Sequence, residues 1–319
     1  MRQSSAERSG VQPLDMLIDQ LYRDAVGYIV SERQEKDGTK QRLEIGTVFF
    51  VKVNNAPDDE FPPGSSTVYA VTARHVISVR VRDGDETLYL RINMPQLGNY
   101  GDFPIMPREW IMDDSTDVAV LRLDHDLQVV AIPLESFISD HALGQLLPGY
   151  GVFMIGLFYP FPGEKTIEPI VRFGNLSLPR IKVGIHLDEG KHEPTYKVDA
   201  HLIETHSWGG HSGSPVFVFE HHYNEPDEFN RSEFTQVRRG DVRASQVNPP
   251  LLGLLHGHHK FSQSLNTVDG QETRLEVHTQ AGIAVVIPAA RIQRILMQPI
   301  LKKEREAKRR LAEPNRLGR

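Results

Sequence analysis

The chain has 319 residues, of which 39% are hydrophobic, and its formal net charge is −6. This length and apolar content allow a core large enough for two domains, and the negative balance gives no reason to expect a nucleic-acid partner. There are no cysteines, so a disulfide framework is excluded. No signal peptide is apparent, and no segment approaches the roughly 18 apolar residues of a membrane span, so we expect a cytoplasmic protein without membrane contact.

The first part of the chain predicts a short helix followed by strands. Residues 1–13 are polar and are expected to be disordered, and residues 14–24 have helical spacing. The segments that follow are short, rich in β-branched and aromatic residues, and separated by Gly, Pro, Asp or Asn. This pattern predicts strands at 25–30, 44–53, 67–73, 86–92 and 117–123.

The second part repeats the pattern after a less regular segment at 133–148. Strands are predicted at 151–158, 168–178, 196–204, 214–220, 250–258 and 281–288. Two polar segments, 221–249 and 261–280, interrupt them and are expected to be long loops or extended hairpins. Many short strands without alternating helices favour an all-β sandwich or barrel.

After Pro288 the pattern becomes helical. Ile292, Ile295, Leu296 and Ile300 can share one face of a helix. We expect the basic segment, 302–319, to be a solvated helix end followed by a frayed tail, with an RNA- or membrane-binding patch as the alternative.

The segment HSWGGHSGSPVFVF, residues 206–219, places Ser212 among glycines and before an apolar run. A serine hydroxyl is a poor nucleophile unless a base takes its proton, a second group orients that base, and donors stabilise the developing oxyanion. Gly210 and Gly213 can adopt backbone conformations that other residues resist. The backbone N–H groups of Gly210 and Ser212 can then converge on one oxygen. Taken alone, the segment is equally compatible with an ordinary surface turn.

Two further motifs give this serine partners. YAVTARHVI (69–77) places His75 after an apolar strand, and STDVAVLRL (115–123) places Asp117 at the head of another. Together with GHSGSP, they resemble the T-A-x-H, D-[IV]-A-[VL]-L and G-x-S-G-[GS]-P motifs of the trypsin-like (chymotrypsin-fold) serine proteases, in that family's order. Weaker similarities at 148–158, 169–177 and 281–296 extend the resemblance over about residues 25–297, nearer to the bacterial housekeeping and glutamyl-endopeptidase-like branches.

The resemblance implies an all-β fold of two antiparallel six-stranded β-barrels with the active site between them and a C-terminal helix. His75 and Asp117 would lie in the first barrel and Ser212 in the second. The expected divisions are a disordered N-terminus, an N-terminal barrel with a leading helix, a C-terminal barrel, and a C-terminal helix with a basic tail, at 1–13, 14–140, 141–290 and 291–319.

The resemblance also implies an intracellular serine endopeptidase that cleaves polypeptides through an acyl-enzyme and needs no cofactor. Ser212 would be the nucleophile, His75 the base and Asp117 its orienting group, with the N–H groups of Gly210 and Ser212 as the oxyanion hole. Asp113 and Asp114 compete with Asp117, but only Asp117 opens the strand motif. The alternatives are a catalytically silent binding module that kept the fold, and a hydrolase acting on esters or on one dedicated partner. The oligomeric state is left open.

The chain departs from the digestive and clotting members of the family. His211 precedes the serine where those enzymes carry an Asp that pairs with a freed N-terminus, and no Ile-Val-Gly-Gly start is present. We therefore expect activity without N-terminal cleavage.

The substrate pocket is expected to contain histidines. By the resemblance, His206 would lie at its base, and His256 and His258 on its wall. Such a pocket would hold a carboxylate by charge-assisted hydrogen bonds; the alternative is that these histidines face solvent and a small apolar residue is preferred. No histidine pair has the H-E-x-x-H zinc spacing, so no metal is expected.

Overall fold

The computed structural model describes residues 18, 20–35, 37–54, 66–83, 87–123, 127–185, 196–206, 209–219, 249–263 and 277–312. The predicted disorder at 1–13, most of the polar segment 221–249, the turn at 264–276 and the last residues of the basic tail lie outside this range. Within the described ranges, no helix has both the length and the apolar character that a membrane crossing needs.

The first half of the chain forms one curved sheet. A short helix, α1 (Gln20–Asp24), precedes it. Eight strands follow in the spatial order β5-β4-β1-β2-β3-β7-β6, with β8 paired to β2. They are β1 (Val26–Gln34), β2 (Lys40–Asn54), β3 (Ser66–Thr72), β4 (Thr87–Met94), β5 (Asn99–Ile105), β6 (Ile111–Met112), β7 (Ala119–Arg122) and β8 (Ile132–Pro133).

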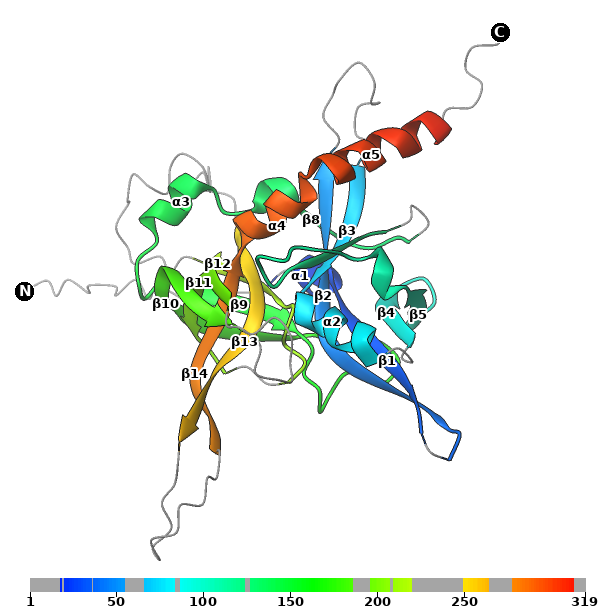
Figure 1. Ribbon diagram of the computed structural model, residues 1–319, viewed down its shortest axis with the longest axis horizontal. Coiled ribbons are helices and arrows are strands. Elements are labelled where there is room, and N and C mark those ends of the chain that lie inside the picture. The colour runs from blue at the N-terminus through cyan, green and yellow to red at the C-terminus, as the bar shows by residue number, and fades with distance from the viewer. Residues whose placement is uncertain are drawn as a thin grey trace, which may run out of the picture.

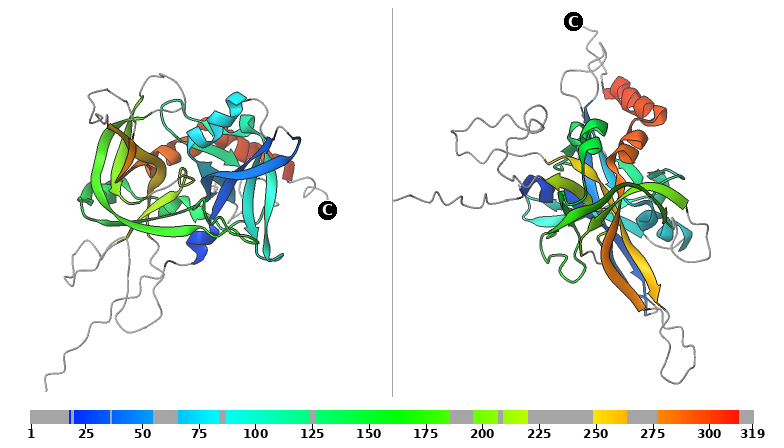
Figure 2. Two further views of the ribbon diagram at one scale, coloured as in Figure 1. Left: turned by 90° about the horizontal axis from the view of Figure 1, so that it is seen from below. Right: turned by 90° about the vertical axis from the view of Figure 1, so that its left-hand side faces the viewer.

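The second half closes into a barrel with the strand order β10-β11-β14-β13-β12-β9. Its strands are β9 (Gly151–Gly156), β10 (Ile170–Ile185), β11 (Tyr196–Glu204), β12 (Pro215–Phe219), β13 (Leu251–Gln263) and β14 (Val277–Pro288). Short helices lie between the strands or after them: α2 (Arg74–Asp83), η1 (Pro107–Glu109), η2 (Leu134–Ser136), α3 (Asp140–Gln145), α4 (Ala289–Leu296) and α5 (Pro299–Ala312). The sheet and the barrel lie side by side, as Figure 2 shows.

This architecture confirms the predicted fold class: mostly β, two antiparallel sheets, and helices at the C-terminal end. The six-stranded count holds for the barrel, whereas the first sheet has eight strands and one parallel contact, between β2 and β8. Three short strands were not predicted: β5, β6 and β8. The β5 sequence NYGDFPI contains Gly and Pro and no apolar run, so it lacks the period-two signal of a half-buried strand.

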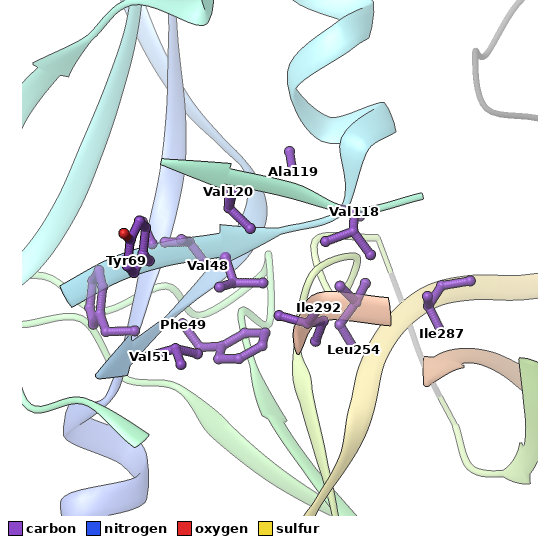
Figure 3. Packing of buried hydrophobic residues seen from close by; sticks show 14 of the residues in the cluster. Val48, Phe49, Val51, Tyr69, Val118, Ala119, Val120, Leu254, Ile287 and Ile292 are labelled. Carbon is purple, nitrogen blue, oxygen red and sulfur yellow. The ribbon is translucent and has the colours of Figure 1, made fainter. Parts of the chain in front are cut away.

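Two hydrophobic clusters follow from the alternation of side chains along the barrel strands. Val152 and Met154 of β9 point into the barrel, in a cluster that takes members from all six strands. Phe153 and Ile155 point out of the barrel and join the larger cluster that the first sheet forms with it. Figure 3 shows this larger cluster, where Phe49 and Val118 of the first half lie near Leu254 and Ile292 of the second. The larger cluster is therefore a core that the two halves share, beside the barrel's own interior cluster.

The C-terminal helices tie the two halves together. In Figure 1, α4 and α5 run from the barrel across to the ends of β2 and β3. The predicted helix end continues into the basic tail: α5 extends to Ala312, and Leu301 and Arg305 are buried. Arg305 is accommodated because its Nη1 donates to the Tyr69 hydroxyl (2.8 Å) and to the Leu296 carbonyl (2.9 Å).

Candidate active site

His75 and Asp117 meet because their strands are neighbours. β3 pairs antiparallel with β7, with Thr72 opposite Ala119. Residues just after β3 therefore lie beside residues just before β7. His75 is the second residue of α2, which starts two residues beyond β3, and Asp117 lies in the bend before β7. Asp117 is fully buried.

Both oxygens of the Asp117 carboxylate bind His75. Oδ1 accepts the backbone N–H of His75 (2.9 Å), and Oδ2 lies 2.8 Å from its Nδ1. An ionised carboxylate only accepts hydrogen bonds, so Nδ1 carries the hydrogen and Nε2 of the neutral ring is left as an acceptor. This is the tautomer that a general base requires.

The two competing aspartates lie in other environments. Asp113 accepts from the backbone N–H and the hydroxyl of Ser115 (2.8 and 2.7 Å), which closes a turn. The Asp114 side chain is 98% exposed and pairs with Arg74. Of the three, Asp117 is the carboxylate that the structure brings to His75.

A second imidazole binds the same carboxylate. His256 of β13 has its Nδ1 2.5 Å from Oδ2 of Asp117, and its ring meets the His75 ring edge to face, with centroids 5.2 Å apart. The side chains of His75 and His256 are only 13% and 16% exposed. His256 is also a residue of the predicted substrate pocket, and that role stays a prediction. The contact of its ring with Asp117 was indicated by no motif.

The two imidazoles determine the charge of Asp117. Burial alone opposes ionisation of this carboxyl, but the adjacent His75 and His256 rings outweigh burial and hold the pKa of Asp117 well below its usual range. Asp117 is therefore a carboxylate throughout the neutral pH range.

The same three side chains are the group that most resembles a metal site among the described residues, with ligand atoms within 4.8 Å of one another. Two nitrogens and one oxygen that share a zinc ion each lie about 2.0–2.2 Å from it, which separates them by more than 3 Å in tetrahedral geometry. The separations of 2.5 and 2.8 Å from Oδ2 to the two Nδ1 atoms are those of hydrogen bonds. Hydrogen bonds from the two Nδ1 atoms to Oδ2 therefore join the three side chains.

The loop that carries Ser212 is held by the first sheet. Gly210 and Gly213 have φ values of +93° and +88°, in the region that favours glycine. A Cβ on Gly213 would lie 2.1 Å from the Thr47 carbonyl oxygen and 2.4 Å from Oγ1 of Thr72, so no larger residue fits there without movement. The chemistry of the loop thus depends on a close approach to β2 and β3.

Thr47 of β2, which the sequence analysis did not single out, fixes this loop. Its backbone N–H donates to the Ser212 carbonyl (2.9 Å), and its hydroxyl donates to the Gly210 carbonyl (2.8 Å). The same hydroxyl accepts the N–H of Leu157 (2.9 Å). Thr47 is fully buried, and a threonine within a regular strand offered no signal of this role.

The Ser212 hydroxyl donates to the backbone carbonyl of His256 at 3.1 Å. A hydrogen bond from Ser212 to His75 is not seen between these two described residues. His256 nevertheless links the serine to the His75–Asp117 pair, because its carbonyl accepts from Ser212 and its ring contacts both other residues. The structure thus gathers Ser212, His256, Asp117 and His75 into one contiguous cluster.

The other predicted site residues are placed as follows. His206 follows β11 and is exposed, and His258 lies in β13 opposite Ala284, with its side chain outside the described part of the chain. His211 is buried, and its carbonyl accepts the N–H of Ser214 (2.9 Å). Among the described residues, neither the Gly210 nor the Ser212 N–H has a hydrogen-bond acceptor.

No protein-family model and no curated protein matches this sequence. Solved structures of proteases do match, at low sequence identity. The MamO protease domain from Magnetospirillum magneticum is 13% identical, with 88% of this chain and 100% of that one covered and a TM-score of 0.45. The Rv3671c protease from M. tuberculosis in its active form is 16% identical, with 87% and 81% covered and a TM-score of 0.46.

A third match is the tobacco vein mottling virus protease, at 13% identity, with 89% of this chain and 83% of that one covered and a TM-score of 0.38. These are matches to chymotrypsin-fold proteases, which is the family that the sequence motifs resemble.

Proposed function

We propose that this chain is a serine endopeptidase that hydrolyses peptide bonds through an acyl-enzyme. The observation that carries the proposal is the His75–Asp117 pair, in which a buried carboxylate binds both the Nδ1 and the backbone N–H of one histidine. Ser212 lies in the same cluster, on a loop whose close contacts with β2 require glycine.

In the proposed reaction, the Ser212 hydroxyl turns from the His256 carbonyl toward Nε2 of His75. Its oxygen bonds to the substrate carbonyl carbon, its proton passes to Nε2, and the carbonyl electrons move onto oxygen. The N–H groups of Gly210 and Ser212 are the proposed donors to this oxyanion. Collapse of the intermediate breaks the C–N bond, and the amine leaves with the proton from His75. Water then repeats these steps to release the acid and regenerate the serine.

Asp117 stabilises the imidazolium that forms on His75, and His256 positions Asp117. Because Nδ1 of His256 donates to Oδ2, the carboxylate is held from a second side and cannot rotate freely. We propose His256 as a positioning residue. His206, which is exposed, and His258 stay proposed residues of the substrate pocket. We also propose a cytoplasmic location, supported by the absence of cysteine from the sequence.

One observation favours a second candidate function, a binding module that kept the fold without catalysis. The Ser212 hydroxyl has a single hydrogen, and it is directed to the His256 carbonyl. If that bond persists when a peptide is bound, the nucleophile is never activated.

A fluorophosphonate probe, which reacts only with an activated serine, separates the two candidates. We expect stoichiometric labelling of the full chain at pH 8, mapped to Ser212 by mass spectrometry. Ser212→Ala should abolish labelling while the folded state is kept. Ser115→Ala is the matched control, since Ser115 lies in a turn near Asp117 and its N–H and hydroxyl both donate to Asp113. A wild-type protein that is folded and does not label contradicts the proposal and favours the binding module.

Labelling does not by itself distinguish a peptidase from an esterase or from an enzyme with one dedicated partner. Digestion of a broad peptide library, with cleavage sites read by mass spectrometry at pH 6 and pH 8, makes that distinction. Cleavage of many peptides supports an endopeptidase. Labelling without any peptide cleavage supports a more specialised hydrolase.

A further inference from the structure

A cavity of about 450 Å³ lies at the mouth of the second barrel. Residues of α3, β10, β11 and the start of α4 line it, and it includes no residue of the Ser212 cluster. Barrel mouths are frequent locations of small-molecule sites. Three features of this cavity point to an anionic ligand.

The first feature is a buried donor that lacks an acceptor. His201 lines the cavity and is 1% exposed; it lies on the face of β11 that Asp199 and Ile203 share, which looks into the barrel. Its Nδ1 accepts the backbone N–H of Arg180 (3.2 Å), so the hydrogen of the neutral ring is on Nε2. Among the described residues, Nε2 has no hydrogen-bond partner. A buried unsatisfied donor is costly, and an acceptor that reached Nε2 from the cavity would remove that cost.

The second feature is positive charge without a counter-ion. Arg180 and Arg294 line the cavity, and in the described part of the chain neither side chain has an ion-pair or hydrogen-bond partner. Arg291 also lines it but is paired with Asp199, which Lys182 approaches as well (3.5 Å). The three arginines and one aspartate of the lining therefore leave two positive charges.

Arg180 is held in an unusual conformation at this place. Its φ is +55°, and among the described residues it is the non-glycine residue with positive φ. It lies at an irregularity of β10, between Leu178 and Ile181. A Cβ on Gly144 would lie 3.3 Å from Nη2 of Arg180, so the guanidinium lies over α3 at the rim of the cavity.

The third feature is the start of α4. Pro288 is its N-cap, no side chain caps it, and its first turn has no acidic residue. The first N–H groups of a helix lack intrahelical acceptors and carry partial positive charge, which favours an anion. Pro288 and Ala290 line the cavity, so these donors lie at the same space as Arg180 and His201.

We propose that this barrel mouth binds a phosphate group carried on a small organic molecule. Two uncommitted guanidinium charges match a phosphate dianion better than a singly charged carboxylate. The helix N-terminus and Nε2–H of His201 supply further donors to its oxygens. The cavity is larger than a phosphate, and Leu143, Ala200 and Ala290 give it apolar walls for the organic part.

Calorimetric titration of the full chain at constant ionic strength tests the proposal, with inorganic phosphate, phenyl phosphate and benzoate as probes. We expect saturable binding, tightest for phenyl phosphate and weakest for benzoate. Arg180→Gln and Arg294→Gln should each weaken phenyl phosphate binding about tenfold or more. Both side chains are exposed at the rim, so both variants should fold. Arg108→Gln is the matched control, because Arg108 is exposed in η1, far along the chain from the cavity.

The proposal is overturned if phenyl phosphate does not bind saturably, or if the two arginine variants bind it as well as the wild type. Equal affinity for benzoate would overturn the preference for phosphate. Ser212→Ala protein should bind phenyl phosphate as the wild type does, so the outcome does not depend on the proposed peptidase activity.

Discussion

His75 and His256 face the Asp117 carboxylate, whereas His201, at the mouth of the barrel, faces the backbone N–H of Arg180. A buried carboxylate only accepts, so it fixes hydrogens on the two Nδ1 atoms and leaves Nε2 of neutral His75 as an acceptor. A backbone N–H only donates, so it leaves Nε2 of His201 as a donor. Burial is common to both regions; the partner of Nδ1 determines whether the histidine can act as a base or as a hydrogen-bond donor.

The charge of the two regions differs for the same reason. Asp117 remains ionised because two imidazoles outweigh its burial. His201 has no carboxylate partner; burial, together with Arg180, lowers its pKa to about 4. His201 is therefore neutral at pH 7. The charged residues of the cavity lining are Arg180, Asp199, Arg291 and Arg294.

The largest expected effect comes from replacing the Asp117 carboxylate, which accepts from Nδ1 of His75, by a group that can donate to Nδ1. In Asp117→Asn the amide can present its NH₂ group to Nδ1, which favours the tautomer that cannot accept the serine proton. We expect the rate of fluorophosphonate labelling to fall by about 10³- to 10⁴-fold. Asp113→Asn, in the adjacent turn, should label within about twofold of the wild type. Wild-type labelling by Asp117→Asn would contradict the assignment of His75 as the base.

The second expected effect concerns stability at acid pH. In the unfolded chain His201 titrates near 6.5, and in the folded chain near 4. Below pH 6.5 the unfolded chain binds the proton more readily, so the free energy of unfolding falls as the pH drops and levels off below about 4. The difference in pKa corresponds to about 3 kcal/mol in total.

Urea denaturation of wild type and His201→Leu between pH 7.5 and pH 4 measures this contribution. As the pH falls, the wild type should lose about 3 kcal/mol more of its unfolding free energy than His201→Leu does, because the variant has no histidine to protonate at this position. His141→Leu, in the exposed part of α3, is the matched histidine control and should track the wild type. A pH-independent difference would mean that His201 does not resist protonation in the folded state.

A smaller effect is expected at His256. His256→Leu removes the donor to Oδ2 of Asp117, and we expect labelling to slow by about tenfold because the carboxylate is then held by His75 alone. His256→Asn keeps an N–H donor and should recover part of the rate, which a purely packing role would not explain. If both variants label like the wild type, His256 does not position Asp117.

The last prediction concerns His211, which is buried next to Ser212. It replaces the aspartate through which digestive and clotting members of the resembled family respond to N-terminal cleavage. The intact chain should therefore label without trimming, and intact-mass spectrometry of the labelled product should give the full-length mass plus the probe. Labelling that requires loss of N-terminal residues would show that an activation step exists.

Local sequence accounted for most of the strands and for the residues that carry the proposed chemistry. Side chains that alternate along β9 and β12 have one face in the barrel and one in the shared core, so period-two and apolar runs identified them. The motifs around His75, Asp117 and Ser212 are local because each residue depends on its own strand end or turn. The short strands β5, β6 and β8 and the full extent of α5 were missed, since their stability comes from neighbours rather than from pattern.

Tertiary structure alone decided which side chains surround those residues. His256 is separated from Asp117 by 139 positions, and its contact depends on β13 reaching the bend just before β7. Thr47 reaches the serine loop only because β2 lies against it, and Arg305 is buried only because α5 crosses the first sheet. A sequence specifies which donors and acceptors a chain has, but the packing of distant segments determines which of them meet out of water, where a hydrogen bond or its absence matters most.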